Sequence, residues 1–169
     1  MIRSLLSAAL VFTAMTTNMP AMAGDTDPAI FLVRHAEKQA GPNPSLTDEG
    51  SARAARLAGQ LENAGIEVIY STNYHRTQET AAPLAEALDL EITSYDPSDL
   101  PGFADHLKAD GRTALVVGHS NTTPALVILL GGEAEPMPET DYDRLYCLSG
   151  EETALLVAGG DALSGPGCP

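Results

Sequence analysis

The chain has 169 residues and a formal net charge of −14 at pH 7, with 9 lysines and arginines against 23 aspartates and glutamates. A surface this acidic repels nucleic acid and anionic lipid, which argues against partners of either class. Any anionic substrate must therefore be captured by a local group of positive side chains. The length suits one domain with a proper core and is too short for two domains of ordinary size.

The first 23 residues have the pattern of a secretory signal. Arg3 supplies a positive start, an apolar stretch runs from Leu5 to Met15, and small residues at 21–23 precede a cleavage point at Gly24. The apolar stretch is too short to span a bilayer, and no later segment approaches the ~20 apolar residues that a membrane helix needs. We therefore expect removal of residues 1–23 and a soluble secreted protein, most simply periplasmic, with no membrane attachment.

Short apolar runs alternate with longer amphipathic stretches along the rest of the chain, which is typical of β-α units around a sheet. The predicted strands cover residues 29–33, 67–71, 90–94, 113–117, 143–148 and 153–158, and the predicted helices cover 48–65, 74–88, 102–109 and 122–130. These elements predict an α/β fold, a three-layer α/β/α sandwich with a mostly parallel central sheet. The domain is expected over residues 24–158, followed by a flexible Gly- and Pro-rich tail over 159–169.

Two cysteines, Cys147 and Cys168, occur in a chain that is expected to reach an oxidising compartment, where disulfides persist. A bridge between them would tie the tail to the last part of the sheet and is the favoured interpretation. The alternative is an unpaired Cys168 in a disordered tail.

Two histidines directly follow predicted strands. His35 lies in the run RHAEK at 34–38, and His119 lies in the run GHSN at 118–121. In an open α/β sheet, residues just past the carboxyl ends of strands line the ligand crevice, so we expect both imidazoles to face one pocket. Arg34, beside His35, and Arg76, at the start of a predicted helix, present planar forks of donors that match phosphate oxygens. A neutral imidazole in such a cradle can attack phosphorus.

The same residues resemble the motifs of the histidine phosphatase superfamily, which has the phosphoglycerate mutase-like fold. The family's Arg-His-Gly tripeptide matches residues 34–36, and its Leu-Thr-x-x-Gly element matches 46–50. Its Ser-x-x-x-x-Arg-Thr-x-x-Thr-Ala element matches 71–81, and its late Gly-His element matches 118–119. The resemblance, with all four motifs in family order, covers nearly the whole mature chain and is closest to the short phosphatase branch. It implies a phosphatase that uses neither metal nor cofactor.

Carried over residue by residue, the resemblance implies that His35 is the nucleophile that forms a phosphohistidine. It also implies that Arg34, Arg76 and His119 bind the transferring phosphoryl group. Further candidates for substrate binding are Thr77, Asn43 and Ser120, while Asn121 either caps a helix or lines the pocket. The expected partner is a small phosphorylated substrate or a phosphoprotein, and nothing in the sequence indicates an oligomeric state.

The sequence departs from the family pattern at two places in the site. Ala36 stands where the family has glycine, which would cause strain only in a left-handed backbone conformation. The proton donor of the larger family members, a glutamate in a loop after the third strand, has no clear counterpart. Glu37, Asp96 and Asp99 are the candidates for that role.

Two other functions compete with this interpretation. A hydrolytic metal centre is disfavoured, because the spacings of metal-binding motifs are absent and an arginine beside a candidate ligand opposes a cation. The second is an exported module that binds a phosphorylated ligand with little or no turnover, which the missing glutamate makes conceivable.

Overall fold

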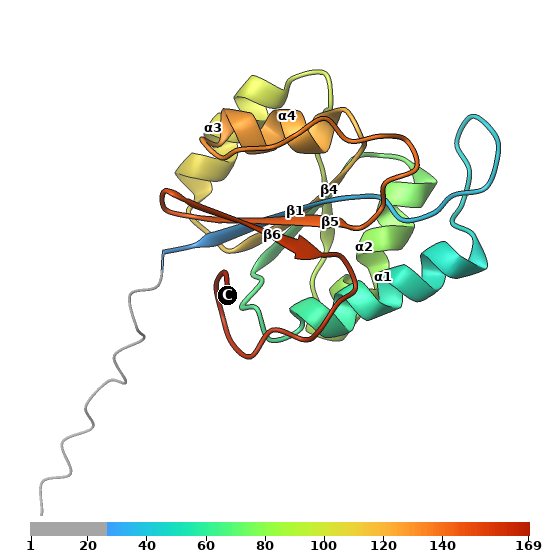
Figure 1. The fold of residues 1–169 in the computed structure, drawn as a ribbon, viewed down its shortest axis with the longest axis horizontal. Helices are drawn as coiled ribbons and strands as arrows, with labels where there is room; N and C mark the ends of the chain where they lie inside the picture. Colours follow the sequence, from blue (N-terminus) through green and yellow to red (C-terminus); the bar gives the residue numbers. More distant parts are fainter. Residues whose placement is uncertain (1–26) are drawn as a thin grey trace, which may run out of the picture.

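In a computed structural model, residues 27–169 are described, and the predicted signal over residues 1–23 lies outside them. One sheet lies between two pairs of helices (Figure 1). The elements in chain order are β1 (Ala29–Arg34), α1 (Asp48–Leu61), β2 (Val68–Ser71), α2 (His75–Leu88), β3 (Ile92–Ser94), α3 (Leu100–Asp110), β4 (Ala114–Gly118), α4 (Thr122–Leu129), β5 (Arg144–Ser149) and β6 (Glu152–Val157). Each predicted strand and helix is present, which confirms the α/β fold.

The sheet has the strand order β3-β2-β4-β1-β5-β6. Its first four strands pair in parallel, whereas β5 runs antiparallel to β1, and β6 runs antiparallel to β5. The central strand β1 thus separates the parallel part of the sheet from a terminal hairpin. β1 and β4 are parallel neighbours, although 79 residues lie between Arg34, the end of β1, and Ala114, the start of β4, so their carboxyl ends meet at the same edge.

The core lies on both faces of the sheet. Along β1, Phe31 and Val33 face the layer of α1 and α2, whereas Leu32 faces the layer of α3 and α4 (Figure 1). This alternation follows from the two-residue period of a strand, and both faces are apolar because helices cover both. Within residues 27–169, no helix combines the length and apolar character needed to cross a membrane.

The segment that follows β1 is held against the start of α1. Thr47 caps this helix, because its hydroxyl accepts from the main-chain nitrogen of Gly50 at 3.1 Å. A Cβ atom at Gly50 would meet the carbonyl oxygen of Glu37 at 2.1 Å, so only glycine allows this approach. The helix ends at Leu61 rather than at residue 65, because Ala64 N bonds to the Leu61 carbonyl and tightens the chain into a turn.

The last residues lie along the α1 side of the molecule (Figure 1). Leu163 N donates to the carbonyl of Gln60 at 2.9 Å, and a disulfide joins Cys147 to Cys168 with a Cα–Cα distance of 5.7 Å. The favoured pairing of the cysteines is thereby confirmed. The division of the chain into residues 1–23, 24–158 and 159–169 stays a prediction. The hydrogen bond of Leu163 and the disulfide of Cys168 show that the last segment contacts the domain.

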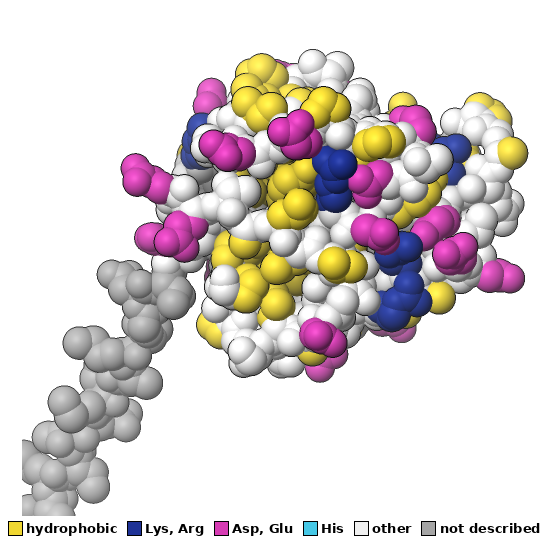
Figure 2. Space-filling view, in the orientation of Figure 1, with side chains coloured by type: hydrophobic (Ala, Val, Ile, Leu, Met, Phe, Trp, Pro, Cys, Tyr) yellow, Lys and Arg dark blue, Asp and Glu magenta, His cyan; other side chains and the backbone are white. Residues whose placement is uncertain are grey.

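Acidic side chains are spread over the face shown in Figure 2, with lysines and arginines at fewer places. Apolar side chains also reach the surface there, and on the edge strand β6 the residues Leu155 and Val157 are exposed. The face shows no concentration of positive charge that would attract an anion from a distance.

Candidate active site

The pairing of β1 with β4 brings the two strand-end histidines together. Arg34 is the register partner of Gly118, so His35 and His119 both come one residue past the paired ends. The His35 main-chain nitrogen donates to the Gly118 carbonyl at 2.9 Å. The centroids of the two imidazole rings are 5.5 Å apart, and the rings are inclined by 68°. Both imidazoles can therefore contact one small anion.

A cavity of about 410 Å³ opens at this edge of the sheet. It is bounded by the segments that follow β1, β2, β3 and β4 and by the loop after α4. The residues that line it are His35, Lys38, Tyr74, Arg76, Pro97, Ser98, His119, Ser120, Asn121, Thr122 and Glu139. This wall includes His35, Arg76, His119 and Ser120, which the sequence predicts for the site, as well as Asn121 and Lys38, for which the sequence leaves a pocket role open.

The His35 side chain is held in the tautomer of a nucleophile. Its Nδ1 lies 2.8 Å from the carbonyl oxygen of Ala36. Because a carbonyl can only accept, Nδ1 carries the proton, and Nε2 keeps its lone pair. The residue is only 2% exposed. Burial, and then the positive charges of Arg34 and Arg76, lower the His35 pKa to about 3, so the imidazole is neutral at pH 7.

His119 is held by a directed chain of hydrogen bonds. A guanidinium nitrogen of Arg76 lies 3.4 Å from its Nδ1, and Thr72 Oγ1 lies 3.0 Å from its Nε2. The Thr72 hydroxyl donates to Thr77 Oγ1 at 3.0 Å, and the Thr77 hydroxyl donates to main-chain carbonyls. Because guanidinium only donates and carbonyl only accepts, Nδ1 is the acceptor and Nε2 carries the proton.

The pKa of His119 is lowered to about 4, first by burial and then by the charges of Arg76 and Arg34. His119 is therefore also neutral at pH 7 while the cavity holds no anion. A bound dianion would favour the imidazolium and draw a proton to it.

Arg76 presents buried donors at the site. Its Nε and Nη1 are buried and have no hydrogen-bond partner among residues 27–169, and its guanidinium carbon lies 4.6 Å from the centre of the Tyr74 ring. Buried N–H groups are almost always hydrogen-bonded, since leaving one unpaired costs about 1–3 kcal/mol. Unpaired donors beside two neutral imidazoles are suited to an oxyanion.

Arg34 lies behind the cavity and is only 1% exposed. Its Nη1 donates to the carbonyls of Pro138 and Asp141 at 3.0 and 3.1 Å, and its Nη2 lies 2.9 Å from a carboxylate oxygen of Glu139. The guanidinium also lies over the ring of Tyr142, 4.4 Å from its centre. Arg34 thus anchors the loop 138–142. Its direct contact with a phosphoryl group stays a prediction, since the Arg34 side chain is not part of the cavity wall.

The remaining candidates for substrate binding lie in different places. Ser120 lines the cavity, whereas Thr77 is buried behind His119 and supports it through Thr72. Asn43 is not part of the wall, and its side-chain oxygen accepts from the main-chain nitrogen of His75 at 3.0 Å. The structure therefore brings Ser120 to the cavity wall, whereas Thr77 contacts Thr72 and does not reach the cavity.

Comparisons with known proteins agree with this geometry. The sequence model of the family described as "Histidine phosphatase superfamily (branch 1)" matches residues 30–97. The solved structure of the protein histidine phosphatase SixA complexed with tungstate superposes with a TM-score of 0.61, over 78% of this chain and 97% of that chain, at 18% identity. The segment 30–97 is thus similar in sequence to the histidine phosphatase superfamily, and the whole domain shares its fold with the SixA structure.

Other solved structures share the fold at low identity. Phosphoserine phosphatase from Entamoeba histolytica, in complex with 3-phosphoglyceric acid, superposes with a TM-score of 0.57 at 16% identity, over 76% of this chain and 94% of that chain. A mycobacterial glucosyl-3-phosphoglycerate phosphatase gives a TM-score of 0.58 at 13% identity, over 79% and 99%.

A curated relative is also similar in sequence. Phosphoserine phosphatase 1 of Hydrogenobacter thermophilus is 37% identical over 75 residues, which is 40% of this chain and 36% of that protein. This chain thus spans little more than a third of the relative that it matches.

Ala36 occupies the position where the superfamily motif has glycine. Asp89 is the only residue other than glycine with a positive φ in the described part of the chain, so Ala36 is not left-handed. Its main-chain nitrogen is 3.0 Å from Thr80 Oγ1, and its side chain is buried. The alanine therefore fits this site without backbone strain.

None of the three carboxylates proposed as proton donors lines the cavity. Glu37 forms a two-pronged ion pair with Arg53, with the shortest distance 2.7 Å. Asp96 accepts from the nitrogen and hydroxyl of Ser98, and Asp99 caps α3 by accepting from Gly102 N. The structure gives these three side chains local structural partners.

Thr72, Tyr74 and Glu139 contact or line this site and were missed by sequence reasoning. Thr72 and Tyr74 follow β2 directly, and the rule that strand ends line the crevice could have found them. Glu139 lies in the Pro-rich loop between α4 and β5, where no periodicity or motif marks it.

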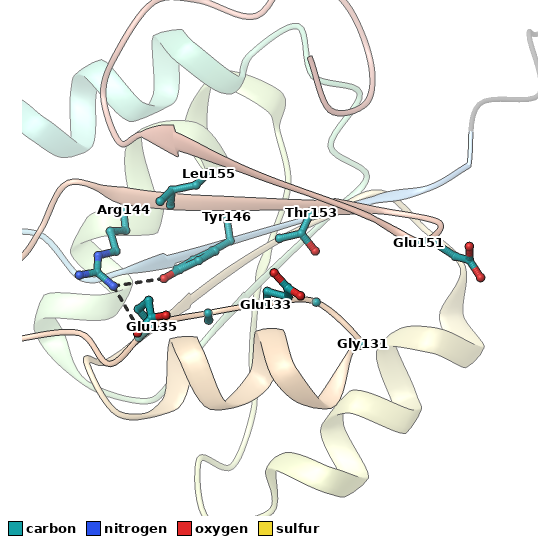
Figure 3. Close-up of a pocket in the computed structure, with 10 residues that line it drawn as sticks. Gly131, Glu133, Glu135, Arg144, Tyr146, Glu151, Thr153 and Leu155 are labelled. Carbon is teal, nitrogen blue, oxygen red and sulfur yellow. Dashed lines mark hydrogen bonds between the residues drawn. The ribbon is translucent and has the colours of Figure 1, made fainter.

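A larger groove of about 700 Å³ lies elsewhere, between the segment after α4 and the hairpin of β5 and β6 (Figure 3). Its wall carries Glu133, Glu135, Glu151 and Arg144, whose guanidinium bonds the Glu135 carbonyl at 3.1 Å. It shares no lining residue with the histidine cavity and offers no nucleophilic imidazole. We therefore place the candidate active site at the smaller cavity, because its histidines can act on a substrate, whereas the larger groove has no such imidazole.

Proposed function

We propose that this protein is a phosphatase that hydrolyses phosphomonoesters without a metal, through a covalent phosphohistidine on His35. The observation that carries the proposal is the tautomer of His35, whose Nε2 has a free lone pair in a cavity with unpaired, buried guanidinium donors. A nucleophile and an oxyanion cradle in one small cavity are the two groups that phosphoryl transfer requires.

In the first half-reaction, Nε2 of His35 attacks phosphorus, and the bond from phosphorus to the leaving oxygen breaks as that oxygen takes up a proton. In the second, water attacks the phosphohistidine, loses a proton and releases inorganic phosphate with the neutral imidazole. Arg76 and His119 face the same cavity and stabilise negative charge on the phosphoryl oxygens in both steps. The positive charge that a metal would supply comes from these side chains.

The activities of similar proteins support a phosphatase. They include a phosphoserine phosphatase and a protein histidine phosphatase. We propose small phosphorylated molecules or phosphoproteins as the substrate class, because the cavity of about 410 Å³ is open at the surface rather than enclosed.

The decisive experiment is turnover of a nitrophenyl phosphate by residues 24–169, with and without a chelator, for the wild type, His35→Ala and His75→Ala. His75 is an exposed histidine outside the cavity and serves as the matched control. We expect turnover that survives the chelator, disappears in H35A and persists in H75A. Turnover lost with the chelator would instead indicate a metal enzyme. Tungstate binding without turnover of any phosphate would indicate a binding module.

We also propose that the protein is exported to the periplasm. The signal pattern over residues 1–23 and the disulfide between Cys147 and Cys168 support this location, because disulfides persist in oxidising compartments. Expression of the full chain, fractionation of the cells and determination of the new amino terminus test it. Protein found only in the cytoplasm and uncut at Gly24 would contradict it.

A further inference from the structure

One carboxylate lines the cavity, and it is none of the three predicted donors. Glu139 is the only acidic residue among the residues of the cavity wall. Its carboxylate lies 2.9 Å from Nη2 of Arg34 and accepts a short hydrogen bond from the hydroxyl of Ser120, which directly follows His119. The side chain is 76% exposed, so it can exchange protons with water.

The main chain on either side of Glu139 is held in place from the nucleophile's own strand. Arg34, at the end of β1, donates to the carbonyls of Pro138 and Asp141, and its guanidinium lies over Tyr142. The loop that carries the carboxylate is thus fixed to the residue next to His35. Such anchoring keeps an exposed acid within the reach of a bound phosphate ester.

Glu139 also interacts electrostatically with charged and titratable groups of the cavity. The charge of Lys38 acts on the Glu139 carboxyl, and the charge of the Glu139 carboxylate acts on the His119 imidazole. Asp96, Asp99 and Glu37 do not line the cavity, and each is held by a local partner, although Ser98, the partner of Asp96, does line it.

We propose that Glu139 is the proton donor of the reaction, an inference that rests on the proposed phosphatase function. As Nε2 of His35 forms its bond to phosphorus and the ester P–O bond breaks, the carboxylic acid of Glu139 transfers its proton to the leaving oxygen. In the second half-reaction, the carboxylate takes a proton from the attacking water, the bond from nitrogen to phosphorus breaks, and phosphate leaves. The acid is thereby regenerated.

Glu139 is ionised in the free protein, because the hydrogen bond from Ser120 and then the charge of Arg34 lower its pKa. A substrate changes this balance. A phosphate dianion attracts the guanidinium and the hydroxyl and repels the carboxylate, which favours protonation of Glu139. A monoanionic substrate also brings the required proton with it.

The test compares two leaving groups. A nitrophenolate leaves readily without a proton, whereas the alkoxide of an alkyl phosphate such as phosphoserine does not. General acid catalysis contributes roughly 10²–10⁴-fold, so we expect Glu139→Gln to lose about 100-fold or more in kcat/KM on phosphoserine and to change little on nitrophenyl phosphate. Glu133→Gln, in the same loop but outside the cavity, is the matched control and should behave as the wild type on both.

Two outcomes would overturn the assignment. Equal losses on both substrates would mean that Glu139 only positions Arg34 or the loop. Unchanged or higher rates on both, with tighter binding of tungstate, would mean that the carboxylate only competes with the phosphoryl group for Arg34. A selective loss that Glu139→Asp partly restores would support the assignment further. A wild type inactive on nitrophenyl phosphate would instead refute the proposed function itself.

Discussion

At the scale of single residues, the chemistry of the site depends on where two protons lie. The Ala36 carbonyl keeps the proton of His35 on Nδ1, and the Thr72 hydroxyl, by accepting at Nε2, keeps that of His119 on the opposite ring nitrogen. The two imidazoles therefore differ in what they can do, although both are neutral in the free protein. One presents a lone pair, and the other can gain a proton when an anion binds.

Thr72→Val removes the acceptor of the His119 proton. We expect kcat/KM on nitrophenyl phosphate to fall, because the imidazole loses its orientation, and the free energy of unfolding to fall by about 1–3 kcal/mol for the buried N–H left unpaired. Thr93→Val, on an exposed position of β3, is the control and should change neither quantity. Steady-state kinetics and urea unfolding measure both. Unchanged kinetics in T72V would show that the hydrogen bonds through Thr72 and Thr77 are not needed to orient His119 for catalysis.

The lowered pKa of His35 predicts how stability depends on pH. An unfolded imidazole titrates near 6.5, whereas burial and neighbouring positive charge lower the folded pKa to about 3. Below pH 6.5 the unfolded state thus binds more protons than the folded state, so the contribution of His35 is complete above pH 6.5 and is lost as the pH falls toward 3.

We therefore expect the free energy of unfolding, measured in urea, to fall less steeply between pH 6.5 and about 5 in His35→Ala than in the wild type. His75→Ala removes an exposed imidazole outside the cavity and is the matched control. Equal slopes in H35A and the wild type would show that the folded His35 titrates normally.

At the scale of elements, an ion-pair cluster connects the segment after β1 to the rest of the domain. Arg53 of α1 bonds the Glu37 carboxylate through two nitrogens and reaches Asp143, just before β5, at 2.6 Å. The Arg53 and Glu37 side chains are each 16% exposed. This cluster, together with the close approach of Gly50, fixes the path of the chain on leaving His35.

Glu37→Gln tests whether this carboxylate is structural. We expect a loss of about 1–3 kcal/mol in the free energy of unfolding, because Arg53 loses a charged partner, and equal changes in kcat/KM on phosphoserine and nitrophenyl phosphate. Glu62→Gln, at the exposed C-cap of α1, is the control. A selective loss on phosphoserine in E37Q would make Glu37 a proton donor and would count against Glu139.

At the scale of the whole molecule, one covalent link joins the end of the chain to the sheet. The bridge from Cys147 of β5 to Cys168 closes a loop with a sequence separation of 21. It lies on the side of the sheet covered by α1 and α2, and its cysteines pack into the core cluster there. The cavity with the histidines is lined by none of these residues.

Cys168→Ser should therefore separate stability from activity. On the chain-entropy model a loop of this length stabilises by roughly 3 kcal/mol, so we expect a loss of this order in the free energy of unfolding and an unchanged kcat on nitrophenyl phosphate. Reductant should weaken the wild type to a similar degree and leave C168S unaffected. A wild type indifferent to reductant, or a C168S variant without activity, would contradict the prediction.

Much of the fold could be predicted from the sequence because its elements have strong local signals. Apolar runs bounded by turn residues marked the strands, and Thr47 marked the start of a helix. The histidines were found because residues at the carboxyl ends of neighbouring parallel strands share one edge of a sheet. These signals depend only on residues close together in the chain.

The sequence by itself determined the elements, the acidic charge and the presence of His35, His119 and Arg76 at strand or helix ends. Only the tertiary structure decided that Glu139 reaches the cavity, that Glu37 pairs with Arg53, and which ring nitrogen of each histidine carries a proton. The physical reason is that a protonation state and a side-chain partner depend on atoms a few ångströms away in space. Such neighbours come from distant segments of the chain, and local periodicity carries no information about them.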